Sequence, residues 1–207
     1  MTTPLLEIAD VCVERGDITV LDRVSLQVAA GEVVVLRGPN GSGKTTLLRV
    51  AAGLTMPVEG EVRRFGGTEV AVAQQRMLWC GHQTGLKDEL TARENLAWFR
   101  RLRAGAGLDV DAALAHLQVA DCADRPVATL SAGQRRRTAL ARLLVANVAV
   151  WLLDEPFTNL DDHSTAIVHN CIDAHVASGG GCLLAAHQLS VDSHPRYRAV
   201  DIGVSHG

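Results

Sequence analysis

The chain has 207 residues, a length that suits one sizeable domain. Hydrophobic residues make up 47% of it and aromatic residues only 3%, so we expect a core of aliphatic side chains. The formal net charge of -3 argues against a protein that binds nucleic acid through bulk positive charge. Five cysteines without CxxC spacing argue against a disulfide framework or structural zinc, and we expect reduced thiols that mostly fill the core.

Neither a secretory signal nor a membrane span is visible in the sequence. Residues 1–4 lack the basic region and apolar stretch of a signal peptide. The longest nearly apolar run, residues 143–153, is too short to cross a bilayer core of about 30 Å. We therefore expect a soluble protein that works at a membrane, if at all, as a peripheral partner.

In chain order, residues 5–13 and 19–28 alternate in hydrophobicity, which predicts strands of an antiparallel edge sheet. The valine-rich run 33–36 is typical of a strand buried on both faces. Further strands are predicted at 59–62, 77–80, 148–153 and 182–186, and helices at 45–52, 91–102, 111–119, 131–145 and 164–177. This order predicts a single α/β domain over 1–207, with a mainly parallel core sheet and a helical subdomain at about 84–145.

A glycine-rich loop follows the strand at 33–36 and precedes a helix. It comprises Gly38, Pro39, Asn40, Gly41, Ser42, Gly43, Lys44 and Thr45, followed by Thr46, and fits G-x-x-x-x-G-K-[ST]. Glycines let backbone N–H groups face one anion, and the helix adds its positive dipole end. Lys44 supplies a charge for the phosphates and Thr45 an oxygen for Mg²⁺. A chance glycine-rich turn is the alternative, and the flanking strand and helix argue against it.

Two acids end the apolar strand at 148–153. Asp154 can hold Mg²⁺ beside the phosphates. Glu155 follows at once, points differently, and is a candidate general base for the attacking water. A solvated acidic turn is the alternative interpretation, and the phosphate loop makes it less attractive.

The segment Leu-Ser-Ala-Gly-Gln at 130–134 has the features of a second anion site at a helix start. Ser131 offers a hydroxyl and Gly133 a flexible backbone at a positive dipole end. Arg135, Arg136 and Arg137 follow, and we interpret them as a solvated helix face.

These motifs and their spacing resemble the ATP-binding cassette family of P-loop NTPases over essentially the whole chain. The resemblance implies a head-to-tail homodimer that binds two ATP molecules and Mg²⁺, each ATP between one subunit's Lys44 loop and the other's Ser131-Gly133 loop. It implies that Gln83 touches Mg²⁺ or water, that 159–161 is the D-loop, and that His187 contacts the γ-phosphate. Without the resemblance, Gln83 and His187 would more often be ordinary polar residues than site residues, and their placement at strand ends is what favours a role in the site.

Two positions depart from the family pattern: Ala132 stands where glycine is commoner, and the second departure concerns the base. Where the family usually has an aromatic residue that stacks on adenine, this chain has Arg15. A guanidinium plane can also stack on a base. The substitution leaves nucleotide binding open but puts base selectivity in doubt, so GTP could compete better than usual.

The stretch 78–96 is similar to the haem exporter ATP-binding subunits of bacterial cytochrome c maturation, the CcmA type. It contains Gly-His-Gln-Thr-Gly-Leu-Lys and Leu-Thr-Ala-Arg-Glu-Asn-Leu, and 153–158 agrees as well. The similarity implies an ABC-type transporter ATPase that couples ATP hydrolysis to transport or release of haem. It also implies integral membrane partners of the CcmB type and a peripheral place on the cytoplasmic side of the cell inner membrane.

Direct haem binding and nucleic-acid binding by this chain are not expected. His163, His169 and His175 recur every six residues, which spreads them around a helix, and we interpret them as solvated surface residues. Three alternatives to haem export stay open: another ABC transporter, a non-transport ABC ATPase acting on ribosomes or DNA, and a nucleotide-binding regulator. The single cassette without long inserts argues against the second, and the set of Lys44, Asp154, Glu155 and His187 argues against the third.

Overall fold

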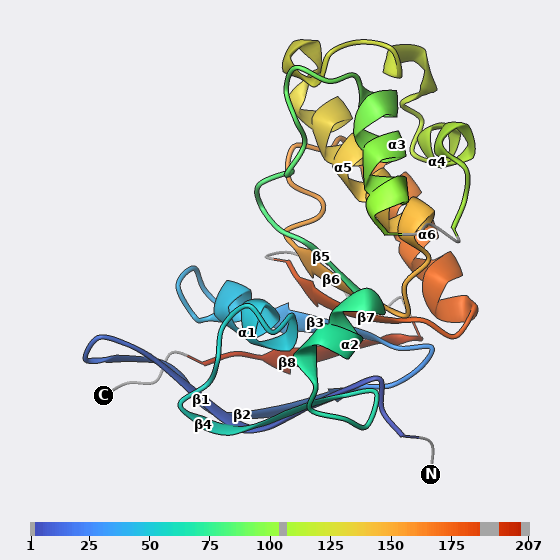
Figure 1. Cartoon of the computed structure of the whole chain (residues 1–207). Coiled ribbons are helices and arrows are strands. Elements are labelled where there is room, and N and C mark those ends of the chain that lie inside the picture. Colours follow the sequence, from blue (N-terminus) through green and yellow to red (C-terminus); the bar gives the residue numbers. More distant parts are fainter. Residues whose placement is uncertain (1–2, 104–106, 187–194, 204–207) are drawn as a thin grey trace. The chain divides into compact units, whose positions relative to one another are not determined.

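The computed structural model describes residues 3–103, 107–186 and 195–203 (Figure 1). The chain forms two compact units. The first, the sheet unit, comprises residues up to 79, 149–155 and 175 onward. The second, the helical unit, comprises 80–148 and 156–174. None of the described helices is long and apolar enough to span a bilayer.

An antiparallel sheet of the sheet unit has the strand order β2-β1-β4. Its strands are β1 (Leu6–Arg15), β2 (Ile18–Val28) and β4 (Glu59–Arg64). A tight turn at Gly16 and Asp17 joins β1 to β2, and Gly16 has the left-handed φ of 58° that such turns require. The expected antiparallel edge sheet is thus confirmed, with β4 as its third strand.

The second sheet has the strand order β5-β6-β7-β3-β8. Its strands are β5 (Met77–Cys80), β6 (Val150–Asp154), β7 (Gly181–Ala185), β3 (Val33–Arg37) and β8 (Tyr197–Asp201). Strand β3 pairs in parallel with β7 and β8, and β6 pairs in parallel with β7. Every residue of β6 and β7 is buried. The parallel core sheet is as the sequence predicts, whereas β8 and the short helix α2 (Val70–Gln75) were not predicted.

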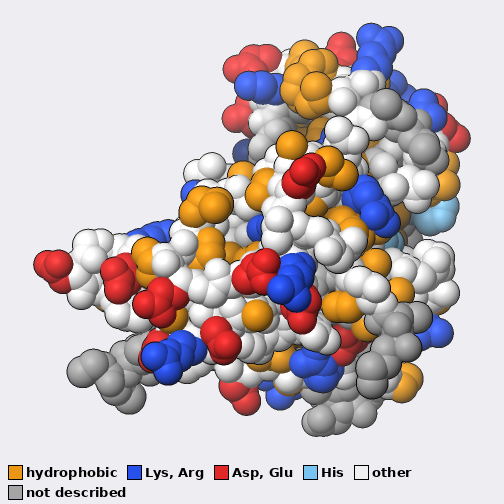
Figure 2. All heavy atoms as spheres, turned by 60° about the horizontal axis from the view of Figure 1, so that its bottom comes forward, with side chains coloured by type: hydrophobic (Ala, Val, Ile, Leu, Met, Phe, Trp, Pro, Cys, Tyr) orange, Lys and Arg blue, Asp and Glu red, His pale blue; other side chains and the backbone are white. Residues whose placement is uncertain are grey.

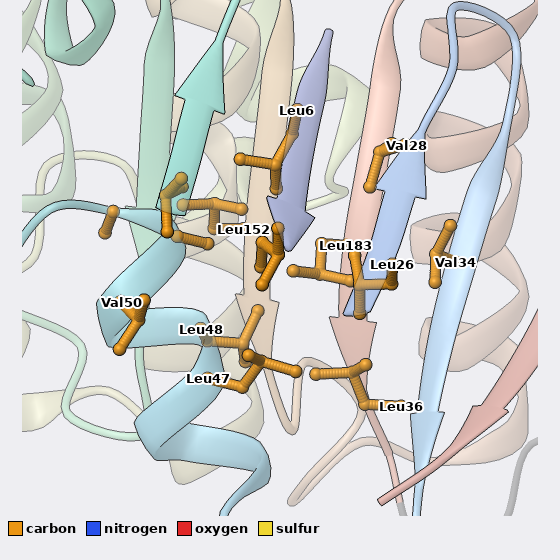
Figure 3. Packing of buried hydrophobic residues seen from close by; sticks show 14 of the residues in the cluster. Leu6, Leu26, Val28, Val34, Leu36, Leu47, Leu48, Val50, Leu152 and Leu183 are labelled. Carbon is orange, nitrogen blue, oxygen red and sulfur yellow. The ribbon is translucent and has the colours of Figure 1, made fainter. Parts of the chain in front are cut away.

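The core of the sheet unit is aliphatic, as expected (Figure 3). Most of its side chains come from the antiparallel sheet, the parallel sheet and helix α1 (Lys44–Ala51). Figure 3 labels Leu6, Leu26 and Val28 from the first, Val34, Leu36, Leu152 and Leu183 from the second, and Leu47, Leu48 and Val50 from α1. Burying each leucine contributes about 1.5–3 kcal/mol, so the helix that follows the phosphate loop is fixed along its apolar side.

The helical unit contains α3 (Ala92–Leu102), α4 (Val110–His116), α5 (Ala132–Ala146) and most of α6 (Asp162–Ala177). Short 3-10 turns at Ala120–Cys122 and Val127–Thr129 lead from α4 to α5. Complete capping boxes open α3 at Thr91 and α5 at Ser131, where each hydroxyl accepts a backbone N–H three residues on. These boxes explain why both helices begin where the sequence predicts.

Charges of both signs are interspersed on the face of the molecule that Figure 2 shows. On the antiparallel sheet, Arg63 forms ion pairs with Glu61 at 2.6 Å and with Glu7 at 3.7 Å. All five cysteines are free, and only Cys171 is not fully buried. The expectation that they mostly fill core space is confirmed.

The interpretation of three histidines as solvated surface residues is wrong for two of them. His175 is half-buried and stacks on Trp151 with ring centroids 4.0 Å apart. His169 stacks on Phe157 at 4.4 Å, and only His163 is exposed. The six-residue spacing does spread the rings around α6, but aromatic partners from the strand β6 and the loop after it cover two of them.

Candidate functional site

The phosphate loop between β3 and α1 has the backbone of an anion cradle. Gly38, Gly41 and Gly43 all have positive φ, of 145°, 83° and 95°. A Cβ at Gly38 would lie 2.5 Å from the Ile202 carbonyl oxygen, and a Cβ at Gly43 would lie 2.5 Å from a methyl group of Leu21. Gly43 has no side chain that could cap α1. Side chains are therefore excluded from the curl, and the helix start is left to an incoming anion.

Lys44 lies against this loop and is 7% exposed. Its Nζ donates to the carbonyl oxygens of Gly38 at 2.7 Å and Pro39 at 2.8 Å. An ammonium group has three protons, so these two bonds hold it in place and leave one for a ligand. The Ser42 hydroxyl is also buried and has no hydrogen-bond partner among the described residues. A polyphosphate would satisfy it, because phosphate oxygens accept such bonds, and the loop therefore fits a nucleotide.

Thr45 and Asp154 meet although 109 residues separate them. The Thr45 hydroxyl lies 3.1 Å and 3.0 Å from the two carboxylate oxygens of Asp154. The register of the parallel sheet explains this, because Leu36 and Asp154 both pair with Ala185 of the intervening strand β7. A hydroxyl and a buried carboxylate together are hard oxygen ligands of the kind that Mg²⁺ prefers, so the residues present fit that ion.

Glu155 leaves strand β6 in an unusual backbone conformation. Its φ is 51°, a left-handed value that is uncommon outside glycine. Its N–H donates to the Ala185 carbonyl oxygen at 2.9 Å, which holds the turn in place. Because of this conformation, the Glu155 side chain points in a different direction from that of buried Asp154. Strained backbone of this kind concentrates at functional sites.

The segment Leu-Ser-Ala-Gly-Gln at 130–134, called the signature from here on, presents Ser131 and Gly133 at the start of α5. Ser131 is exposed, and its hydroxyl accepts from the Gln134 N–H at 3.2 Å. A Cβ at Gly133 would lie 2.9 Å from the Asn159 carbonyl oxygen, so glycine is required where the segment 159–161 packs on this helix. Asn159 itself has a φ of 64°. The signature and the D-loop segment thus meet within the helical unit.

Gln83 and Arg15 are both exposed. Gln83 lies three residues beyond β5, and Arg15 is the last residue of β1, where it pairs with Ile18. His187 lies outside the described residues. Of the predicted site residues, the structure brings together the phosphate loop with Thr45 and Asp154, and the pair Ser131 and Gly133.

The interpretation of the arginines at 135–137 as a solvated helix face is wrong for Arg136 and Arg137. Arg136 is 4% exposed and donates to the carbonyl oxygens of Gly81 at 2.7 Å and Pro156 at 3.2 Å. Arg137 donates to the carbonyls of Leu117 and Gln118. Backbone carbonyls at the ends of neighbouring segments need donors, and these guanidinium groups supply them. A sequence signal did exist, because position 136 shares the helix face of the apolar positions 139, 140 and 143.

Comparison with known proteins identifies a family for this chain. The family model described as ABC transporter matches residues 21–158. The chain is 40% identical over 207 residues to the cytochrome c biogenesis ATP-binding export protein CcmA of Pseudomonas fluorescens (strain Pf0-1), covering 98% of each chain. It is 46% identical over 187 residues to the protein of the same name from Salmonella typhi, covering 89% of this chain and 90% of the relative.

Solved structures with the same fold include a putative ABC transporter ATP-binding protein from Pyrococcus furiosus. The TM-score is 0.82 at 24% identity, over 95% of this chain and 96% of that one. The ATP-binding cassette MJ0796, solved as a dimer in a post-hydrolysis state bound to ADP and Pi, gives 0.77 at 23% identity over 88% of each chain. The chain therefore belongs to the ABC transporter family, and within it to the CcmA type.

Proposed function

We propose that this chain is the ATP-hydrolysing subunit of an ABC-type export complex that serves cytochrome c biogenesis, with haem as the transported or released group. The observation that carries the ATPase part is the pairing of Thr45 with Asp154 beside the glycine cradle that holds Lys44. The export part rests on the long matches to export proteins of cytochrome c biogenesis. Haem as cargo rests on the resemblance of the segment 78–96.

The phosphate loop would bind the nucleotide through residues 38–46, with Lys44 on the β- and γ-phosphates. Thr45, Asp154 and Gln83 would hold Mg²⁺, which offsets phosphate charge when bound. Glu155 would accept a proton from the attacking water, and Gln83 and His187 would orient the reacting groups. Arg15 would stack on the base.

The active assembly would be a homodimer in which Ser131 and Gly133 of a second copy contact ATP. The Ser131 hydroxyl and the N-terminus of α5 could bind an anion, as the N-terminus of α1 could, and this supports the arrangement. The partners would be integral membrane subunits of the CcmB type, with this chain peripheral on the cytoplasmic side of the inner membrane. We propose a role for this chain in driving the exporter, without direct contact to haem or nucleic acid.

The test is complementation of a bacterial strain that lacks the gene for this chain. Wild-type protein should restore covalently bound haem in c-type cytochromes, whereas Glu155→Gln should not, with b-type cytochromes as an unaffected control. Membrane fractionation with and without the neighbouring membrane subunits forms the second arm. Soluble behaviour in both cases would contradict the transporter assignment, and normal c-type cytochromes in the deletion strain would contradict the haem assignment alone.

A further inference from the structure

The segment that carries Gln83 is anchored by arginine side chains of α5. The Arg136 guanidinium donates to the Gly81 carbonyl oxygen at 2.7 Å, two residues before Gln83. Arg142, six residues further along the same helix, donates to the carbonyl oxygen of Thr84, the residue after Gln83. Gln83 therefore lies on a short stretch of backbone that is hydrogen-bonded to arginine side chains of α5 both before and after it.

Further contacts hold each of the two guanidinium groups in place. Arg136 is 4% exposed and also donates to the Pro156 carbonyl oxygen at 3.2 Å, so its guanidinium ties two separate segments to the helix. Arg142 donates to the Ala139 carbonyl at 3.1 Å and lies 5.5 Å from the centre of the Phe99 ring. Both groups are thus held in place before any ligand binds.

Glycine at position 85 fits this arrangement. Its φ is 62°, and a Cβ there would lie 3.2 Å from the Arg142 guanidinium. The chain therefore turns directly over the arginine. Just downstream, Asn95 fixes the next turn, since its side chain accepts from the Lys87 N–H at 2.8 Å and donates to the Lys87 carbonyl at 3.0 Å.

We propose that Arg136 and Arg142 are positioning residues that set the location of Gln83 relative to the signature at the start of α5. Lysine cannot replace either, because a single ammonium lacks the planar fork that reaches two acceptors in fixed directions. A shift of α5 caused by a ligand at Ser131 would move Gln83 with it. The consequence for hydrolysis rests on the proposed function, in which Gln83 takes part in the chemistry.

The test uses the full chain with Arg136→Lys and Arg142→Lys, and Arg101→Lys on the exposed side of α3 as the matched control. Amide hydrogen exchange of residues 81–86 should speed up in both test variants and not in the control. ATP affinity should stay near that of wild type, because the proposed phosphate contacts come from residues 38–46. The kcat for hydrolysis should fall by about 10- to 100-fold, the cost of misplacing a reacting group by about 1 Å.

A double variant separates positioning from general damage. In a Gln83→Ala background, Arg136→Lys should reduce kcat no further, because both changes act through one group. If the kcat losses of Gln83→Ala and Arg136→Lys multiplied in the double variant, the link to Gln83 would be wrong. If amide exchange at 81–86 were unchanged in both lysine variants, the two arginines would not hold this segment. If Gln83→Ala hydrolysed ATP normally, the proposed role of Gln83 would be wrong. The hydrogen-exchange data alone would then test whether Arg136 and Arg142 hold residues 81–86 in place. Should Arg136→Lys not fold, half-buried Arg142 carries the same test.

Discussion

The phosphate loop and the Gln83 segment both present polar groups beyond the end of a strand, but they are supported in different ways. The phosphate loop is held by its own backbone, with Lys44 donating to carbonyls only five and six residues away. The Gln83 segment is held by side chains of α5 that lie 55 and 58 residues further along the chain. One support is local in sequence, and the other depends on tertiary packing.

This difference explains what each region can do. A loop closed by glycine geometry and its own lysine forms whenever β3 and α1 form, so its anion cradle is present before a ligand arrives. A segment gripped by a neighbouring helix takes the position of that helix. The first arrangement suits tight binding of phosphates, and the second suits a residue that responds to movement of α5.

The largest expected effect is a loss of ATP hydrolysis when Glu155, which follows Asp154 beside the phosphate loop, is replaced. Replacing a general base by its amide removes the proton acceptor while keeping shape, so Glu155→Gln should lower kcat by about 10²- to 10⁴-fold. ATP affinity should persist, and size-exclusion chromatography with ATP should show a trapped dimer. Glu59→Gln, at an exposed position of β4, is the matched control. Hydrolysis at the normal rate would exclude Glu155 as the base.

The second prediction compares two glycines of the phosphate loop. Both have positive φ, but a Cβ at Gly41 would meet nothing within 4 Å, whereas one at Gly43 would lie 2.5 Å from Leu21. Gly41→Ala should therefore cost about 1–2 kcal/mol of backbone strain. Gly43→Ala should cost about 1–3 kcal/mol more through overpacking, and it should weaken ATP binding further. Urea unfolding and nucleotide titration measure both, and equal losses would mean that strain alone shapes the loop.

The same contrast between local and tertiary support decided what the sequence could predict. The G-x-x-x-x-G-K-[ST] pattern, the valine-rich strand β3 and the acids after β6 all carry local signals, and the fold they indicate was found. The burial of Arg136 is indicated only by its place on the apolar face of α5, because the residue type does not reveal which distant carbonyls need donors. Strand β8 was missed for a related reason, since its five residues become a strand only by pairing with β3.

Two matched capping boxes in the helical unit give the third prediction. Thr91→Ala and Ser131→Ala each remove a cap hydroxyl, and each should cost about 1 kcal/mol of stability. Only Ser131→Ala should also reduce ATP hydrolysis, by about 10- to 100-fold, because a hydrogen bond to a charged phosphate contributes about 1.5–3 kcal/mol. Steady-state kinetics at saturating ATP make the comparison. If both variants lost activity equally, the effect would come from helix stability and not from the signature.

The smallest expected effect lies at the opposite end of β6 from Asp154, where His175 stacks on Trp151. Burial lowers the pKa of His175 below its ordinary value of 6.5. As pH falls below that value, the unfolded chain takes up a proton that the folded one resists, so the folded state loses stability. The contribution of His175 is complete above the unfolded pKa and is lost as pH falls through the folded pKa.

Urea unfolding between about pH 5 and pH 8, the range over which histidines titrate, measures this loss. The wild-type free energy of unfolding should decline towards the acidic end. His175→Asn should decline less steeply, because the buried titrating group is gone, although it is less stable overall without the stack on Trp151. His163→Asn, at an exposed position of the same helix, should keep the wild-type slope. An unchanged slope in His175→Asn would show that groups other than His175 cause the decline over this pH range.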